Sequence, residues 1–313
     1  MAYPSRLWFA LALAAPVTGA SAGGDEPSVA MPSAQAESSV GQTALTYVKL
    51  NDGTLIAVEC AGTGPTLLIV HGGVGDRTRW TPMFPLLSSN LTACAMDRRG
   101  HGLSGDSPEY SLRKEAEDVA AVVDSRPGVV FVLGHSYGGV AALEATFLTS
   151  RIAKLMLYEP PLHEPAERGL AVAAQIEKLV KAGELEQALV TFQTKIVEQS
   201  PSEIAAMKAR PSWPRLVATI GTQPRQMRAL AAYRFDAERM KSVTMPTLLL
   251  IGENTASTHM KDAISRLQAS LPDATLIVLK NQQHSAMDAA RAVLATAIID
   301  FAAGAGSRER DGT

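Results

Sequence analysis

Val129-Val130-Phe131-Val132-Leu133-Gly134-His135-Ser136-Tyr137-Gly138-Gly139 is the stretch that decides the fold of this chain. Its first half is apolar and mostly β-branched or aromatic, which is typical of a buried strand. The following run, from Val140 to Thr149, has the composition and spacing of a helix. Glycines on both sides of Ser136 allow strand and helix to approach each other, so we expect Ser136 to stand strained and exposed at the strand's carboxyl edge.

The turn Gly134-x-Ser136-x-Gly138 is suited to chemistry as well as to folding. The N-terminus of the helix behind Ser136 offers backbone N–H groups to a developing negative charge. A tight turn without function is the alternative interpretation, because so short a pattern also occurs by chance. With a strand before it and a helix after it, the stretch resembles the nucleophile elbow of the α/β-hydrolase family.

Strands and helices alternate along the rest of the chain. Apolar runs predict a hairpin of residues 43–50 and 54–60, then strands at 66–70, 91–96, 152–158, 247–251 and 275–279. Helices are predicted at 80–87, 112–123 and 291–301. This alternation implies a mostly parallel sheet with helices on both faces.

Two motifs that follow predicted strands extend the resemblance to the same family, His71-Gly72-Gly73 and Asp97-Arg98-x-Gly100-His101-Gly102-x-Ser104. The resemblance implies the α/β-hydrolase fold, with a mostly parallel eight-stranded sheet and a helical cap. Residues 162–243 carry helical patterns broken by prolines and would form that cap. Ligands of open α/β sheets bind at the carboxyl ends of the strands, where this segment begins. We therefore favour a cap over the active site to a helical decoration far from it.

The chain supplies a nucleophile and a base in the order that the family uses. Ser136 is a weak nucleophile until a base removes its proton. His284 follows the last predicted strand, and the family's order of nucleophile, acid and histidine implies that it is the general base. The other histidines are expected to point away from Ser136 (His135), to support loops (His71 and His101) or to be solvated (His163 and His259).

The acid that orients His284 is the least conventional prediction. In most of the family it stands three residues beyond the glycine after the cap. That glycine is Gly252 here, and the position holds Thr255, which cannot carry a charge. We predict Glu159, at the end of the strand after the elbow helix, because some family members take their acid from there. Its neighbour Pro160 would restrict Glu159 to an extended backbone. Glu253 is the alternative acid, and a water or another group is the third choice.

An oxyanion requires two backbone N–H donors. Tyr137, directly after the nucleophile, supplies one, and we predict Gly73 as the other, with Val74 as the alternative. Arg98 and Arg99 are interpreted as braces of the loop after their strand. The alternative role for the two arginines is to bind an anionic group of the substrate.

The length, composition and net charge of the chain argue against some classes of binding partner. The chain has 313 residues, of which 46% are hydrophobic and 19% charged, with a formal net charge of −2. That length suits one large α/β domain with an insertion, and the charge argues against nucleic acid or an anionic membrane as a partner. No pattern resembles a zinc site or a phosphate loop, so we expect no metal or organic cofactor and a small-molecule substrate as partner. The oligomeric state cannot be read from these features.

The first residues predict export. Residues 1–22 have a charge at Arg6, a short apolar run and a small-residue cleavage site at Ala20-Ser21-Ala22, as in a secretory signal peptide. We therefore expect a periplasmic or secreted protein with no membrane attachment after cleavage. Residues 23–41 and 304–313 have the composition of a disordered linker and tail, which leaves 42–303 for the hydrolase domain.

The two cysteines, Cys60 and Cys94, lie in predicted strands that the hydrolase topology would make neighbours. In an oxidising compartment they could pair. Direct cross-strand disulfides are geometrically awkward, so we interpret the two cysteines as buried free thiols.

Together these features predict a serine hydrolase that cleaves a small to medium carboxylic ester through an acyl-enzyme. The same triad acting on a lactone, an amide or a C–C bond, or as a cofactor-free perhydrolase, is one alternative, and a non-catalytic ligand receptor is another. Ser136 argues against a dehalogenase or an epoxide hydrolase, which would use an Asp nucleophile in this fold. The apolar cap predicts neutral, largely apolar substrates, with Tyr137 and Trp80 as candidate pocket residues.

Overall fold

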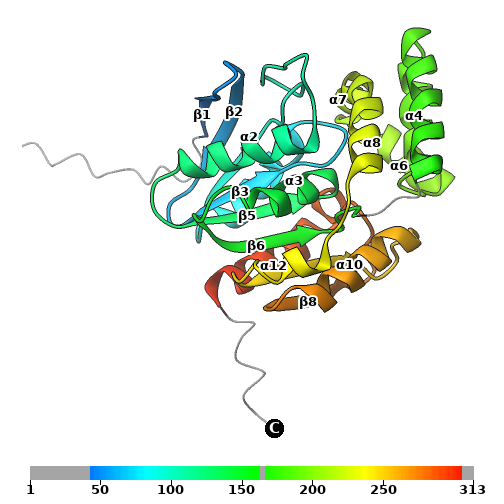
Figure 1. Cartoon of the computed structure of the whole chain (residues 1–313). Helices are drawn as coiled ribbons and strands as arrows, with labels where there is room; N and C mark the ends of the chain where they lie inside the picture. Colours follow the sequence, from blue (N-terminus) through cyan, green and yellow to red (C-terminus); the bar gives the residue numbers. More distant parts are fainter. Residues whose placement is uncertain (1–42, 163–165, 305–313) are drawn as a thin grey trace, which may run out of the picture. The chain divides into compact units, whose positions relative to one another are not determined.

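Eight strands form a sheet in the order β1-β2-β4-β3-β5-β6-β7-β8 (Figure 1). The computed structural model describes residues 43–162 and 166–304. Strands β1 and β2 form the expected hairpin, β2 also pairs antiparallel with β4, and every later neighbour is parallel. The strands are β1 (Ala44–Lys49), β2 (Leu55–Ala61), β3 (Thr66–Val70), β4 (Thr92–Met96), β5 (Val130–His135), β6 (Ile152–Tyr158), β7 (Thr247–Gly252) and β8 (Ala274–Leu279).

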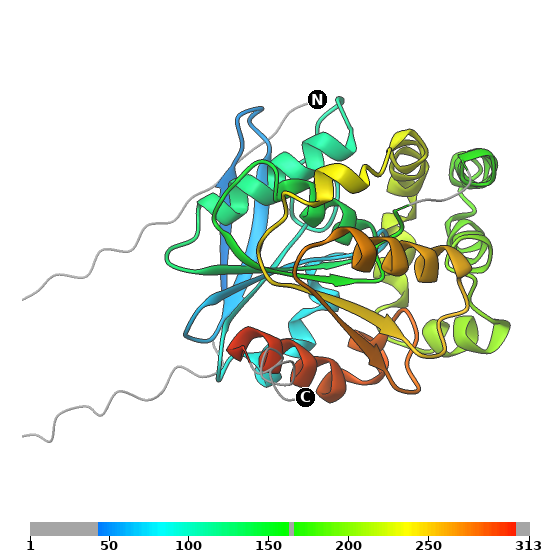
Figure 2. The same ribbon diagram turned by 60° about the horizontal axis from the view of Figure 1, so that its bottom comes forward.

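Helices cover both faces of this sheet, which explains why the central strands are continuous apolar runs (Figure 2). Helices α2 (Leu112–Asp124), α3 (Tyr137–Ala145) and α10 (Thr258–Ser270) share one apolar core with one face. Helices α1 (Phe84–Leu87), α11 (Ala286–Ala289) and α12 (Arg291–Ala303) share a second core with the other face. The predicted α/β-hydrolase architecture is therefore confirmed.

The segment predicted as one helix over residues 80–87 is helical but is divided into short pieces. Two 3₁₀ turns, Arg77–Arg79 and Thr81–Met83, precede the single turn of α1. Pro82 and Pro85 explain the difference, because neither can donate the backbone hydrogen bond that a continuous helix needs.

The segment between β6 and β7 is helical and has its own core. Ile176, Leu189 and Trp213 are buried together there, and Val74, from the loop after β3, packs among them. Figure 1 shows helices α4, α6, α7 and α8 gathered at the end of the sheet toward which the arrow of β6 points. The helices are α4 (Ala166–Lys181), α5 (Leu185–Lys195), α6 (Pro201–Lys208), α7 (Trp213–Thr219), α8 (Gln223–Ala232) and α9 (Ala237–Met240).

Cys60 and Cys94 form a disulfide, which corrects the prediction of two free thiols. They are register partners in the antiparallel pair of β2 and β4, and their Cα atoms are 4.0 Å apart. Facing positions of an antiparallel pair place both side chains on the same face of the sheet. The sequence predicted the neighbouring strands but not this register.

The predicted signal peptide (1–22), the linker (23–41) and nearly all of the predicted tail (304–313) lie outside the described residues. Within the part of the chain that the structure describes, no helix combines the length and apolar character needed to cross a membrane.

Candidate active site

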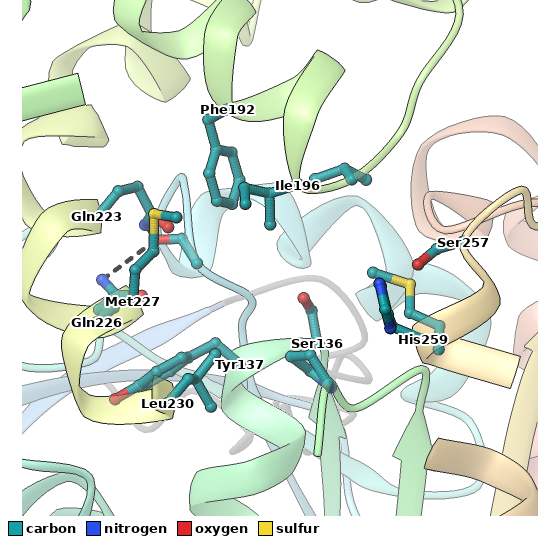
Figure 3. Close-up of a pocket in the computed structure, with 14 residues that line it drawn as sticks. Ser136, Tyr137, Phe192, Ile196, Gln223, Gln226, Met227, Leu230, Ser257 and His259 are labelled. Atoms are coloured by element: carbon teal, nitrogen blue, oxygen red, sulfur yellow. Dashed lines mark hydrogen bonds between the residues drawn. The ribbon is translucent and has the colours of Figure 1, made fainter. Parts of the chain in front are cut away.

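Ser136 stands at the junction of β5 and α3 with backbone angles of φ 52° and ψ −128°. Its N–H donates to the carbonyl of Tyr158 at 2.9 Å, and its carbonyl accepts from Gly139 N at 2.8 Å. A Cβ at position 134 would lie 2.5 Å from the Cα of Gly139, and one at position 138 would lie 2.3 Å from the carbonyl of His71. The glycines are thus required by close packing. Figure 3 shows the Ser136 hydroxyl pointing into a cavity.

His284 and Glu159 form a buried pair, with Nδ1 2.6 Å from Oε2. Glu159 is fully buried, and its other oxygen accepts hydrogen bonds from Gly252 N at 2.8 Å and from the hydroxyl of Thr255 at 2.5 Å. These donors fix the carboxylate, so His284 carries its proton on Nδ1 and keeps Nε2 for proton exchange.

His135 holds the backbone of His284 beside the elbow. Its Nε2 lies 2.9 Å from the His284 carbonyl, and the two ring centroids are 4.6 Å apart. Burial lowers the pKa of His135 well below its ordinary value, so the ring is neutral and donates through Nε2. His135, next to the candidate nucleophile, therefore supports the backbone of the candidate base.

Glu253 does not contact His284. Its side chain is exposed and accepts a hydrogen bond from Asn281 N at 2.9 Å. Thr255, at the position where most of the family carries the acid, instead donates to the Glu159 carboxylate.

The backbone of Glu159 differs from the expected extended form, since its φ is 46°. The residue continues the ladder of β6 through a bond from its N–H to the carbonyl of Leu250 at 3.1 Å. Its carboxylate must also turn toward His284 and Gly252. These contacts together outweigh the local preference of a residue before proline.

The peptide between Gly72 and Gly73 is clamped. Its oxygen accepts from His71 Nδ1 at 2.8 Å and from Arg98 Nη2 at 3.0 Å. The N–H of the same peptide belongs to Gly73, which lines the cavity with Tyr137. Val74 is not among the residues that line this cavity, and its side chain packs into the core of the cap, so Gly73 remains the better candidate for the second oxyanion donor.

Arg98 links the two candidate oxyanion donors. Its guanidinium is fully buried, pairs with Glu115 at 2.9 Å and lies 4.8 Å from the centre of the Tyr137 ring. The hydroxyl of Tyr110 joins the carboxylate of Glu115 to the hydroxyl of Tyr137. The same Arg98 thus touches the loop that carries Gly73 and the residue after the nucleophile.

The prediction that both arginines brace their loop is confirmed. Arg99 holds Asp118 through two hydrogen bonds of 2.5 and 2.6 Å and also pairs with Asp52 at 3.2 Å. His101 bonds the carbonyl of Gly75 at 2.9 Å, and His71 accepts the N–H of Arg98 at 3.1 Å. Both histidines therefore support loops as expected.

The cavity over Ser136 has mostly apolar walls and an empty volume of about 520 Å³, including the part open to solvent. His259, which we expected to be solvated, lines it and is half-buried. Trp80 is not among its lining residues and is fully buried, with its ring centre 5.7 Å from that of His135. The apolar lining residues are Pro161, Phe192, Ile196, Val197, Met227, Leu230 and Met260.

Four polar residues that line the cavity were not predicted from the sequence to do so: Gln223, Gln226, Ser257 and His259. Gln223 and Gln226 stand three residues apart on α8 and are nearly fully buried. The available signal was their spacing, since glutamines three residues apart on a helix lie on the same face. The structure shows that this face is buried, and buried polar groups need hydrogen-bond partners. Gln223 Nε2 donates to the carbonyl of Gly73.

The match with known proteins agrees with this fold. Residues 67–297 match the family model described as the alpha/beta hydrolase family, so the chain belongs to that family and is an α/β-hydrolase. The 2-(acetamidomethylene)succinate hydrolase of Mesorhizobium japonicum is 25% identical over 264 residues, which are 77% of this chain and 88% of that protein.

Solved structures extend this result. An alpha/beta hydrolase from Sphaerobacter thermophilus has a TM-score of 0.73 at 30% identity, with 82% of this chain and 99% of that chain covered. An esterase, EaEST from Exiguobacterium antarcticum, shares the fold with a TM-score of 0.67 at 18% identity, over 82% of this chain and 98% of that chain.

Proposed function

We propose that this hydrolase cleaves small to medium carboxylic esters through an acyl-enzyme formed on Ser136. The observation that carries the proposal is the pair of His284 and Glu159 held beside an elbow whose serine opens into an apolar cavity. Because Glu159 fixes the tautomer of His284, Nε2 can take the Ser136 proton as the hydroxyl attacks the ester carbonyl.

The tetrahedral oxyanion would then be met by the N–H groups of Gly73 and Tyr137. His284 returns the proton to the leaving alcohol, and the acyl group stays on Ser136. Water, activated by the same histidine, attacks the acyl-enzyme and releases the acid, which restores the free serine. The apolar lining of the cavity supports an apolar acyl group.

Labelling with a fluorophosphonate probe tests this proposal. We expect one covalent adduct, located at Ser136 by peptide mass spectrometry, and its absence in Ser136→Ala. A panel of p-nitrophenyl esters, lactones and anilides then ranks the bond that is cleaved. An unlabelled Ser136 in folded protein would favour the receptor alternative, and faster cleavage of lactones or anilides than of esters would replace the ester assignment.

We also propose that the chain is exported to the periplasm or the exterior. The pattern of residues 1–22 and the disulfide between Cys60 and Cys94 support this, because disulfides persist in oxidising compartments. Cell fractionation and the intact mass of the exported protein provide the test. Protein found only in the reducing compartment would refute export, and an exported mass that starts at Met1 would refute cleavage of the signal peptide.

A further inference from the structure

The wall of the cavity at the start of α10 contains polar groups that the mechanism above does not use. Ser257 is only 2% exposed and lines the cavity, yet its hydroxyl does not cap α10. Within the described residues, that hydroxyl makes no hydrogen bond to the protein and borders the cavity. A hydroxyl that has no protein partner and borders a cavity is free to donate to a bound molecule, so this position favours a ligand that accepts a hydrogen bond.

The first turn of α10 adds further donors beside Ser257. In the described part of the chain, the amides of residues 258–260 have no acceptor, and the N-terminal end of a helix favours negative or acceptor atoms. His259 lies 3.4 Å through Nε2 from Arg168 Nη1. Arginine can only donate, so the His259 ring accepts at Nε2 and carries its own proton on Nδ1.

This wall faces the departing part of the substrate. The oxyanion loop follows β3, on one side of the strand that ends at Ser136, whereas β7, α10 and His284 lie on the other side. Figure 3 shows Ser257 and His259 across Ser136 from Gln223 and Gln226, and Gln223 holds Gly73. Because His284 gives its proton to the leaving oxygen, the leaving group departs toward this side.

We infer that Ser257, His259 and the first turn of α10 form a subsite for a hydrogen-bond-accepting oxygen on the leaving group of the substrate. The oxygen belongs to an amide or to a carboxylate. Arg168, which contacts His259, is itself paired with Glu198 at 2.8 Å, so its positive charge is largely balanced. The wall therefore offers hydrogen-bond donors with little net charge, which suits either an amide or a carboxylate. The inference rests on the proposed esterase function and refines the expectation of a wholly apolar substrate: the acyl part is apolar and the alcohol part carries the acceptor.

Three butyrate esters that differ only in the leaving phenol test the subsite: para-tolyl, para-carbamoylphenyl and para-carboxyphenyl butyrate. The measured quantity is kcat/KM of each acceptor-bearing ester divided by that of the tolyl ester, which cancels general effects on catalysis. We expect Ser257→Ala to lower one or both ratios by about 3- to 10-fold, the loss of one hydrogen bond. The control is Ser265→Ala, on the exposed side of the same helix, which should keep both wild-type ratios.

A second readout needs no turnover. Ligand-observed NMR compares the binding of para-hydroxybenzamide and para-cresol to the wild type, Ser257→Ala and Ser265→Ala, each checked for folding by its thermal transition. A weaker preference for the benzamide in Ser257→Ala alone supports the subsite, even if Ser136 is never labelled and the esterase proposal fails. Wild type without any preference for the acceptor-bearing compounds, or equal ratios in wild type and Ser257→Ala, would overturn the inference.

Discussion

Replacing Glu159 by glutamine should reverse the tautomer of His284. In the native site one oxygen of Glu159 faces Nδ1 of His284, and the other accepts from Gly252 N and the Thr255 hydroxyl. A glutamine can satisfy the last two donors only with its carbonyl oxygen, which turns its NH₂ group toward Nδ1. Two donors cannot face each other, so the imidazole must move its proton to Nε2. The ring then presents a donor to Ser136 and cannot act as its base.

The size of the effect follows from this geometry. The carboxylate is fully buried, so no water replaces the lost orientation. Loss of the correct tautomer in a comparable triad lowers kcat by about 10⁴-fold, and we expect Glu159→Gln to lose roughly 10³- to 10⁴-fold. The backbone fold should persist, because the substitution is isosteric and keeps two of the three hydrogen bonds.

Steady-state hydrolysis of p-nitrophenyl butyrate measures this change, with thermal unfolding as the check on folding. Glu253→Gln is the matched control, since its carboxylate bonds Asn281 N and not His284. That variant should keep kcat within a factor of about two of the wild type, as expected for a surface substitution away from the site. An active Glu159→Gln enzyme, or a crippled Glu253→Gln enzyme, would refute the assignment of the acid.

Four further outcomes can be measured on the same protein. Ser136→Ala should lower kcat by roughly 10⁴-fold or more with an unchanged circular dichroism spectrum; near-native turnover would place the nucleophile elsewhere. Arg98→Lys should lower kcat/KM by roughly 10- to 100-fold through the oxyanion loop, whereas the equally buried Arg99→Lys should affect mainly stability in urea. The three buried histidines of the loops and the elbow have pKa values lowered by burial and stay neutral in the folded state. Below about pH 6.5 the unfolded chain gains their protons, so the unfolding free energy should fall by up to about 1.4 kcal/mol per pH unit for each histidine; urea titrations without such a fall would contradict this. Joint replacement of Cys60 and Cys94 by serine should cost about 3–4 kcal/mol for their separation of 34 residues, and reactive thiols in denaturant would show that the disulfide does not form.

The sequence predicted most of the fold because its signals are local. The elbow glycines and the apolar runs on either side of them specify strand, turn and helix within a few residues. The prediction failed where prolines divided a short helix near residue 82 and where register decided the outcome. Cys60 and Cys94 were known to lie in neighbouring strands, but only the pairing of β2 with β4 shows that they face each other.

The residues of the candidate site also separate into those that local sequence signals predict and those that depend on how distant elements pack. Ser136 was predicted from the glycines of the elbow, and His284 from its place after the last strand together with the order of residues in the family. Glu159 came from the absence of a carboxylate at position 255, and the structure adds that Thr255 serves as its hydrogen-bond donor. The polar wall at Ser257 and His259 was out of reach, because it depends on how α10 and the cap meet over the elbow.

The packing of Val74 against the cap limits how the cap of this enzyme can be replaced. Its side chain belongs to the core of the cap, while the preceding residue is the candidate oxyanion donor. Gln223, on a cap helix, also holds the carbonyl of Gly73. The cap that lines the candidate pocket and the loop that carries the candidate oxyanion donor are therefore packed as one unit. If this cap were exchanged for that of another hydrolase, the pocket would change, but the loop that carries Gly73 would lose its contacts with the cap. Engineering of specificity in this scaffold would have to carry the contacts of Val74 and Gln223 along with the cap.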